Sequence, residues 1–241
     1  MRQIILAINA LLKFKAYTLI NVLGLACSLA CVLTVARYIH QENTVNQCFP
    51  EYKRICLIKT STSSGENFLG GYRSGLEKDP DVEQFTVIYQ ISDMPVLFGE
   101  QEIAANAFSV DSTFFKIFPY RVIAGSGRIV RPRDVVITRS FWMKKLGGKN
   151  AIGATFKNTK GNKFTIVGVV DDPDTKTSWT PDIFMSNELD EFLFFDPIYA
   201  MLMASDADIA LLNKKYSKEH PRSKWSTYET VRYQYLPVKD L

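Results

Sequence analysis

An unbroken apolar stretch near the N-terminus, Ala16 to Ala36, is the strongest hydrophobic signal in the chain. It reads AYTLINVLGLACSLACVLTVA and contains no Asp, Glu, Lys or Arg. At about 1.5 Å of rise per residue, a helix of this length spans about 30 Å, the thickness of the hydrocarbon core of a bilayer. Its Leu, Ile and Val side chains favour insertion by about 3 to 5 kcal/mol, with no charge to offset them. The pattern predicts a transmembrane helix over residues 16–40.

A basic leader precedes this stretch. Apolar residues recur there at three- and four-residue spacing, which predicts an amphipathic helix over residues 1–15 at the cytoplasmic membrane interface. Arg2, Lys13 and Lys15 are its only charged residues. Because basic flanks stay in the cytoplasm, we expect a cytoplasmic N-terminus, a single pass through the inner membrane and a periplasmic main domain. A cleaved signal peptide is the rival interpretation, but no small-residue cleavage motif follows Val35, which favours an uncleaved anchor.

Polar and small residues within the apolar stretch are typical of a helix that packs against other helices. Asn21 is expected to face protein, since an unpaired amide is costly in lipid. Gly24 with Ser28, and Ala26 with Ala30, form pairs of small residues at four-residue spacing, and we expect both pairs on one side of the helix. Such pairs are also common in any apolar helix. We take Asn21, Gly24 and Ser28 as the candidate helix-packing residues.

Residues 41–241 mix the two-residue alternation of strands with the periodicity of helices. Strands and helices interleave without the regularity of a doubly wound sheet, so we predict an α+β domain, possibly of two lobes. Asp111 is expected to cap a helical turn that carries Phe114, Phe115 and Phe118 into a core. A turn is expected over 61–65. The predicted strands cover 54–60, 84–90, 94–98, 102–110, 133–138, 163–170, 181–186, 198–203 and 228–235, and the predicted helices cover 71–78, 139–146 and 207–216.

Composition matters here mainly through the distribution of charge. The 241 residues are 46% hydrophobic, enough for a sizeable core, and carry a net charge of +4. Setting aside the three basic residues of the leader leaves 26 Lys and Arg against 25 Asp and Glu. The basic excess is therefore mostly a membrane-topology signal, and we expect no nucleic-acid partner.

Two of the four cysteines leave alternatives open. Cys27 and Cys31 lie within the apolar stretch, where they act as small apolar residues. Cys48 and Cys56 follow it, in a compartment that can be oxidising. They either form a disulfide, or Cys56 is packed in a strand while Cys48 stays free.

The sequence contains no recognisable motif for catalysis, cofactor binding or metal binding. The Gly-rich segments 124–127 and 146–153 fit neither a phosphate-binding loop nor a dinucleotide fingerprint and are interpreted as turns. His40 and His220 lack Cys or His neighbours at metal-ligand spacing. The acidic cluster Asp171, Asp172 and Asp174 lacks the Gly and Glu of a calcium loop and is interpreted as a turn. We predict no catalytic, cofactor-binding or metal-binding residue and no enzymatic activity in this chain.

Six motifs in a fixed order carry a resemblance to a known family. They are LLKFKAYTLINVLGLACSLACVL, YKRICL at 52–57, FSVDSTFFKIF at 108–118, DVVIT at 134–138 with the Gly-rich segments 146–148 and 151–153, FTIVGVVDDP at 164–173, and YQYLPVKDL at 233–241. Together they resemble the N-terminal half of MacB/FtsX-like ABC-transporter permeases, in the branch common in Bacteroidota. The sequence departs from the family pattern in Ala151 for Pro, in Ala154 for Lys, and in lacking the Asp and Phe expected near Asn46 and Cys48.

The resemblance implies a partner for each part of the chain. It implies a dimer with a second permease copy, and a cytoplasmic ABC ATPase subunit as a further partner. ATP would bind only to the ATPase subunit, whose hydrolysis of ATP would drive movement of the periplasmic core domain or export. Permeases of this type have further transmembrane helices. If this chain is a truncated permease, we expect a second polypeptide from a split gene to supply those helices. The alternative is a stand-alone single-pass periplasmic binding or adaptor module without transport activity. An anchored hydrolase is a third interpretation, which no motif supports.

Overall fold

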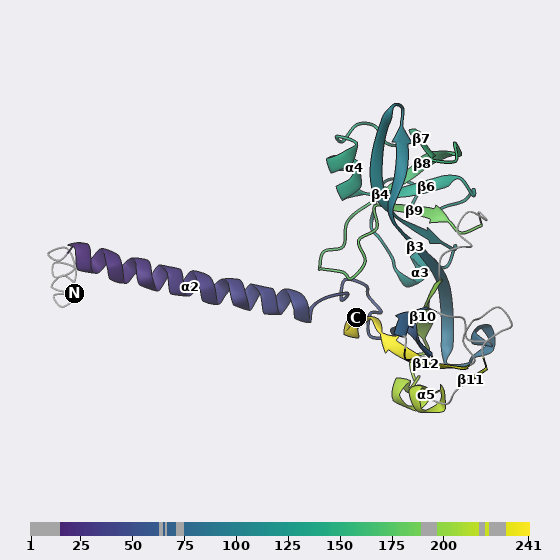
Figure 1. Cartoon of the computed structure of the whole chain (residues 1–241), viewed down its shortest axis with the longest axis horizontal. Coiled ribbons are helices and arrows are strands. Elements are labelled where there is room, and N and C mark those ends of the chain that lie inside the picture. The colour runs from purple at the N-terminus through teal and green to yellow at the C-terminus, as the bar shows by residue number, and fades with distance from the viewer. Residues whose placement is uncertain are drawn as a thin grey trace. The chain divides into compact units, whose positions relative to one another are not determined.

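The chain divides into two compact units, the first ending at Thr44 and the second running from Val45 to Leu241. The computed structural model describes residues 15–62, 65, 67–70, 75–188, 197–216, 220–221 and 230–241 (Figure 1). It places a long helix in the first unit and a sheet-rich fold in the second. The predicted fold class, one N-terminal candidate transmembrane helix followed by a mixed α+β domain, is confirmed.

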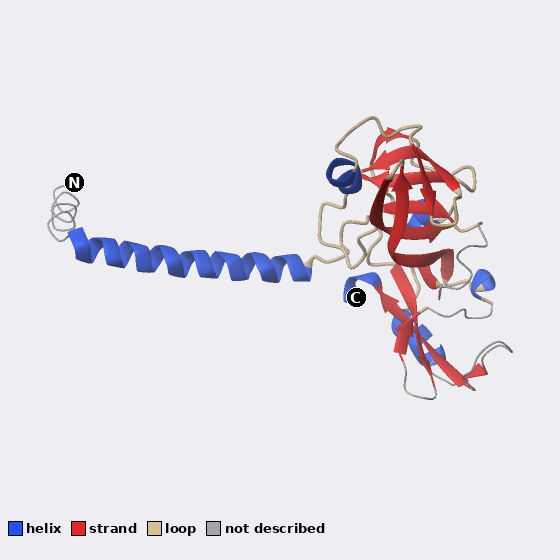
Figure 2. Cartoon of the chain, turned by 45° about the horizontal axis from the view of Figure 1, so that its top comes forward, coloured by secondary structure: helices blue, strands red, loops and turns tan. Residues whose placement is uncertain are grey.

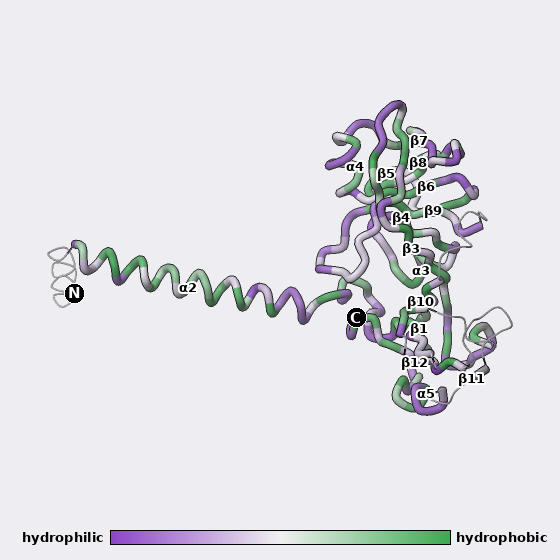
Figure 3. The backbone as a smooth tube through the Cα atoms, viewed as in Figure 1, coloured by the Kyte–Doolittle hydropathy of each residue, from purple (hydrophilic) through white to green (hydrophobic). Residues whose placement is uncertain are grey.

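The helix of the first unit, α2 (Lys15–Asn43), has no buried residue. Its most apolar window has a mean hydropathy of 2.3, so the helix is long and apolar enough to cross a membrane (Figure 3). It extends past residue 40, the predicted end. The predicted interfacial helix over residues 1–15 lies outside the described residues, apart from Lys15.

The two pairs of small residues do not share a side of α2, contrary to expectation. An α-helix turns by about 100° per residue, which puts Ala26 about 200° from Gly24. The Ala26–Ala30 pair therefore lies on the opposite face. Asn21, Gly24 and Ser28 fall within about 60° of one another and do share a face.

Twelve strands form one sheet in the described part of the second unit. The main order is β11-β12-β1-β10-β3-β4-β9-β6-β8-β5, with β2 beside β1, and β7 beside both β3 and β8. The strands are β1 (Ile55–Thr62), β2 (Asn67–Leu69), β3 (Val82–Phe98), β4 (Gln101–Val110), β5 (Val122–Gly125), β6 (Asp134–Thr138), β7 (Thr155–Asn158), β8 (Lys163–Val170), β9 (Ile183–Ser186), β10 (Ile198–Met203), β11 (His220–Pro221) and β12 (Thr230–Pro237). The α-helices are α3 (Phe114–Ile117), α4 (Arg139–Lys145) and α5 (Ile209–Tyr216), and the 3-10 helices are η1 (Leu76–Lys78) and η3 (Val238–Asp240).

Six of these strands close into a ring. β3 pairs with β4, β4 with β9, β9 with β6, β6 with β8, β8 with β7, and β7 pairs back with β3. One buried cluster draws side chains from all six, among them Ile91, Ile103, Val135, Phe156, Phe164 and Ile183. The ring is therefore a small barrel with a side-chain core, and Phe141 of α4 joins this cluster.

The rest of the sheet is flatter (Figure 2). Its strands β1 and β10 are buried on both faces. Ile55 and Leu57 of β1 pack into a cluster with α3, whereas Cys56 and Ile58 pack into a second cluster with α5. Successive residues of a strand point to opposite faces, which explains why this strand is apolar along most of its length. The α3 cluster also receives Phe108 of β4 and Phe184 of β9, so it joins the flat part to the barrel.

Several predicted bounds need correction. The strands expected over 84–90 and 94–98 are one strand, β3, in which Asp93 takes a positive φ of 51° at a bulge between Ile91 and Met94. The turn expected over 61–65 begins later, because β1 runs to Thr62. Of the helix expected over 71–78, only η1 is helical in the described part, and 71–74 lie outside it. The first two residues of the strand expected over 228–235 also lie outside it.

Two local predictions have an outcome in the structure. Asp111 does cap the turn with Phe114, since its Oδ1 accepts hydrogen bonds from the backbone N–H groups of Thr113 (2.8 Å) and Phe114 (3.1 Å), although Thr113 is the N-cap residue of α3. The four cysteines, all of which are described, are free, with Cys56 buried in β1 and Cys48 half-buried. The disulfide alternative is therefore not the one that the structure adopts.

Candidate functional site

The three candidate helix-packing residues lie on one exposed face of α2. Ser28 donates its hydroxyl to the carbonyl oxygen of Gly24 at 2.8 Å, so its polar group is satisfied within the helix. A Cβ added at Gly24 would meet nothing within 4 Å, which leaves the backbone open to close approach. Among the described residues, no hydrogen bond reaches the Asn21 side chain, which is exposed. This face therefore combines an open backbone at Gly24 with an exposed amide at Asn21.

Asn46, three residues after the end of α2, ties the start of the second unit to two remote segments. Its Nδ2 donates to Ser178 Oγ (2.9 Å) and to the Val238 carbonyl (2.8 Å), and its Oδ1 accepts from the Ser178 N–H (2.8 Å). Its own N–H donates to the Lys176 carbonyl at 2.9 Å. The side chain is 2% exposed. Asn46 therefore clamps the entering chain to the 176–178 loop and to η3 near the C-terminus.

The conformation of Asn46 explains why an amide suits this position. Its φ is +61°, in the left-handed region that Asn tolerates better than most residues with a Cβ. An amide also supplies both a donor and an acceptor, and here it uses both. An aspartate, which the family pattern places nearby, would lack the donor for Val238.

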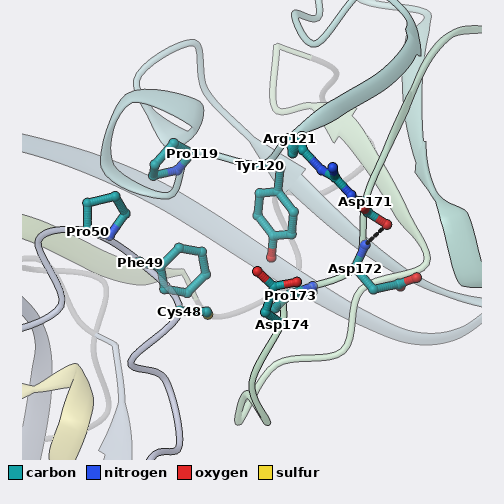
Figure 4. A pocket seen from close by; sticks show the side chains of 10 residues that line it. All are labelled: Cys48, Phe49, Pro50, Pro119, Tyr120, Arg121, Asp171, Asp172, Pro173 and Asp174. Atoms are coloured by element: carbon teal, nitrogen blue, oxygen red, sulfur yellow. Dashed lines mark hydrogen bonds and ion pairs between the residues drawn. The ribbon is translucent and has the colours of Figure 1, made fainter.

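A pocket of about 360 Å³ lies beside this clamp, between Cys48–Pro50, Pro119–Arg121 and the loop 171–174 (Figure 4). The Tyr120 ring stands at its centre and packs against Phe49, with ring centroids 5.9 Å apart. Burial raises the pKa of the Tyr120 hydroxyl, with smaller contributions from Cys48 and Asp172. Burial is also the main cause of the raised pKa of Cys48.

The acidic loop beside the pocket is held by contacts within the domain. Asp171 forms ion pairs with Arg121 and Arg139, and the Arg121 guanidinium is the larger cause of its lowered pKa. Asp172 accepts from both the N–H and the hydroxyl of Ser140 at 2.9 Å, in the first turn of α4. These contacts fit the interpretation of this cluster as a structural turn. Among the described residues, no group of three or more His, Cys, Asp or Glu is placed to hold a metal ion.

The pocket has little capacity for nucleophilic chemistry. A thiol with a raised pKa stays protonated near neutral pH, and the thiolate is the reactive form. None of the residues that line the pocket is a histidine. His40 lies on α2 in the other unit, and the His220 side chain lies outside the described residues.

Sequence reasoning missed the clamp and the pocket. In the sequence, Asn46 stands out only as a departure from the family pattern. Cys48 stands out for the same reason and as a possible disulfide partner of Cys56, whereas Tyr120 does not stand out. The dipeptide Pro119–Tyr120 after an aromatic-rich helix was the one local signal for a fixed aromatic side chain here.

One family model matches the chain over most of its length. The sequence profile described as the MacB-like periplasmic core domain matches residues 18–215, which include most of α2 and most of the second unit. No curated protein sequence matches the chain.

Solved structures share the fold at low sequence identity. A domain of a putative permease protein from Porphyromonas gingivalis has a TM-score of 0.63 at 17% identity, covering 78% of this chain and 91% of that one. The periplasmic region of MacB from Actinobacillus actinomycetemcomitans has a TM-score of 0.54 at 14% identity, with 71% and 83% covered. The extracellular domain of the noncanonic ABC-type transporter YknZ from Gram-positive bacteria has a TM-score of 0.53 at 16% identity, with 75% and 99% covered.

These matches confirm the resemblance drawn from the six sequence motifs. They also account for a candidate transmembrane helix followed by a sheet-rich domain of the periplasmic type. The chain belongs to the family of MacB-like periplasmic core domains, which are parts of ABC transporter permeases and not enzymes in the classical sense.

Proposed function

We propose that this chain is the membrane-anchored periplasmic core part of an ABC transporter permease, and that it couples ATP hydrolysis on a cytoplasmic partner subunit to conformational change or export in the periplasm. The observation that carries the proposal is the family match, which runs through α2 and the folded domain together. The Asn46 clamp supports it, because a displacement of the chain that enters from α2 would be passed directly to Val238 and to the 176–178 loop. The N-terminus lies in the cytoplasm in this proposal, as the basic leader favours.

The helix face of Asn21, Gly24 and Ser28 is the proposed contact with the other transmembrane helices of the transporter, from a second copy or from another permease polypeptide. An asparagine amide shared between helices contributes about 0.6 to 2 kcal/mol in a bilayer, and small residues permit close packing. In this proposal, assembly of the transporter depends on this face of α2 and not on the apolar character of the helix in general.

Purification of the tagged full chain from its native host in mild detergent tests the proposal. We expect an ABC ATPase subunit to copurify, identified by mass spectrometry. The double variant Gly24→Leu with Ser28→Leu should reduce its recovery at least several-fold. The matched control, Ala26→Leu with Ala30→Leu on the opposite face, adds similar bulk and should retain the complex.

Two results would count against the proposal. A chain that purifies without any ATPase would favour a stand-alone binding or adaptor module. Equal losses in the two double variants would remove the role of the Asn21 face. Orientation is checked separately with a C-terminal alkaline phosphatase fusion, which is active only when exported; an inactive fusion at normal expression would reverse the proposed topology.

A further inference from the structure

Charge is distributed very unevenly within the second unit. Residues 121–163 hold eleven Lys and Arg against a single acidic residue, Asp134. The remainder of residues 45–241 holds 14 Lys and Arg against 23 Asp and Glu. A domain of nearly zero net charge is thus strongly basic over the segment that forms β5, β6, α4, β7 and the start of β8.

Six of these cations gather where the β7–β8 hairpin meets the loop before β6, and we call them the basic face: Arg128, Arg131, Arg133, Lys157, Lys160 and Lys163. Lys157 of β7 and Lys163 of β8 are direct cross-strand partners, and Lys160 lies in the turn between these strands. Arg133 Nη2 donates to Asn162 Oδ1 at 3.3 Å, and the Arg133 carbonyl accepts from Thr165 N–H at 3.0 Å. Arg128 and Arg131 line one hollow of about 330 Å³ over Thr165 of β8.

Nothing in the described part of the chain neutralises the basic face. All six side chains are exposed, and none forms an ion pair with a described residue. The one acidic residue of the segment, Asp134, is 8% exposed and uses its carboxylate to accept from the Arg131 N–H at 3.0 Å. Like charges directly opposite one another on a sheet destabilise it, so the Lys157–Lys163 pair costs the fold some stability.

An exposed aliphatic side chain lies among these cations. Val130 is 78% exposed, the most exposed large hydrophobic residue in the described part of the chain. It stands in the run Arg128-Ile129-Val130-Arg131-Pro132-Arg133, and Arg128 and Arg131 line the same hollow as Val130. Arginines flanking an exposed aliphatic group match a lipid interface, where phosphates lie just outside the acyl chains.

We propose that the basic face binds the surface of an anionic phospholipid membrane. A surface of separate, exposed cations suits a fluid array of phosphates better than a single small anion. Val130 enters the headgroup region while Arg128 and Arg131 contact phosphates beside it. The candidate transmembrane helix keeps lipid near the domain at high local concentration, so modest affinity suffices.

The test uses the full chain held in nanodiscs of neutral phosphatidylcholine, mixed with vesicles of phosphatidylcholine alone or with 30% phosphatidylglycerol. We expect flotation with the anionic vesicles only, and less of it as salt is raised. Each lysine near an anionic surface contributes about a fivefold gain in binding, so Lys157→Gln, Lys160→Gln and Lys163→Gln together should weaken binding by about 100-fold. The matched control, Lys78→Gln with Lys116→Gln and Lys239→Gln, removes three exposed lysines outside the segment and should change binding less than fivefold.

A second measurement tests whether the basic face binds the same membrane in which the chain itself is anchored. The full chain is reconstituted in vesicles with a photoactivatable phosphatidylglycerol headgroup, and crosslinked peptides are expected from 121–163. Absence of both vesicle flotation and crosslinks in this segment overturns the proposal, as do equal losses in the two triple variants. A third result would also overturn the proposal: the chain does not bind anionic vesicles, but it self-associates without lipid, and the triple variant of Lys157, Lys160 and Lys163 abolishes that self-association. The basic face would then bind the acidic part of a second copy.

Discussion

The Asn46 clamp gives the sharpest test of how the folded domain is held together. Replacing Asn46 with Ala removes three side-chain hydrogen bonds to Ser178 and Val238. Because Asn46 is only 2% exposed, its former partners are left unpaired in a buried site. At about 1 kcal/mol for each bond, the loss is about 3 kcal/mol. The φ of +61° adds about 1 kcal/mol, because Ala tolerates the left-handed region less well than Asn does. The expected cost is about 4 kcal/mol.

A second substitution separates these two causes. Asn46→Gly loses the same hydrogen bonds but adopts the positive φ freely, so it should be about 1 kcal/mol more stable than Asn46→Ala. Urea unfolding of the full chain in nonionic detergent measures both changes by tryptophan fluorescence. Trp179 follows Ser178 in the clamped loop and packs against Phe118 with ring centroids 5.5 Å apart, so it reports the region directly.

The control is Asn150→Ala, at an exposed asparagine, which should change stability by no more than about 0.5 kcal/mol. A loss below about 1 kcal/mol for Asn46→Ala would refute the clamp. A Gly variant no more stable than the Ala variant would refute the account of the strain while leaving the hydrogen bonds in place.

Three further predictions concern the same domain. Asp111→Ala should cost about 2 to 4 kcal/mol in urea unfolding, because its carboxylate accepts from Thr86 Oγ1 and the Val87 N–H as well as capping α3; a cost below about 1 kcal/mol contradicts this. Gly168→Ala should cost about 1 to 3 kcal/mol, since the added Cβ would overlap the Ser126 carbonyl oxygen and push β5 from β8; an unchanged melting temperature would show that β5 is not packed there. Burial raises the pKa of Cys56 from 9.0 to about 12. As pH rises, the unfolded chain therefore loses the thiol proton before the folded chain does, and the free energy of unfolding falls between these two pH values. The expected fall at pH 10 is about 1 kcal/mol. Cys56→Ala should lose correspondingly less between pH 8 and pH 10 than the unchanged chain does, and identical losses would exclude this thiol as the cause.

Strands whose signal is local were predicted well. β8 and β10 have the predicted bounds, because each is an apolar run closed by polar residues or a turn. β7 was missed, because a run of four residues with three polar ones has no pattern of its own. It forms a hairpin with β8 and also pairs with Val96 and Leu97 of β3, and the pairing with β3 joins residues far apart in the chain.

Long-range partners also explain why the clamp was not predicted. Asn46 reaches Ser178 and Val238, 132 and 192 residues away, and neither partner has an unusual sequence context. At Asp93 the error is the opposite one, because the sequence predicted a break between two strands that the structure does not contain. Ser92–Asp93 has the composition of a turn, which led to two predicted strands, yet pairing with β4 on both sides carries β3 through it as a bulge.

The continuity of β3 has a mechanical consequence. Its 17 residues extend about 55 Å and pair with β10 at one end and with β7 at the other, so the barrel and the flat part of the sheet share one backbone. We expect a load applied to the flat part to be carried along this strand and not through side-chain packing alone. The β3–β4 ladder shifts its register between Ile91 and Met94, so we expect the strand to bend most easily there. Bending of the domain would then be concentrated near Asp93.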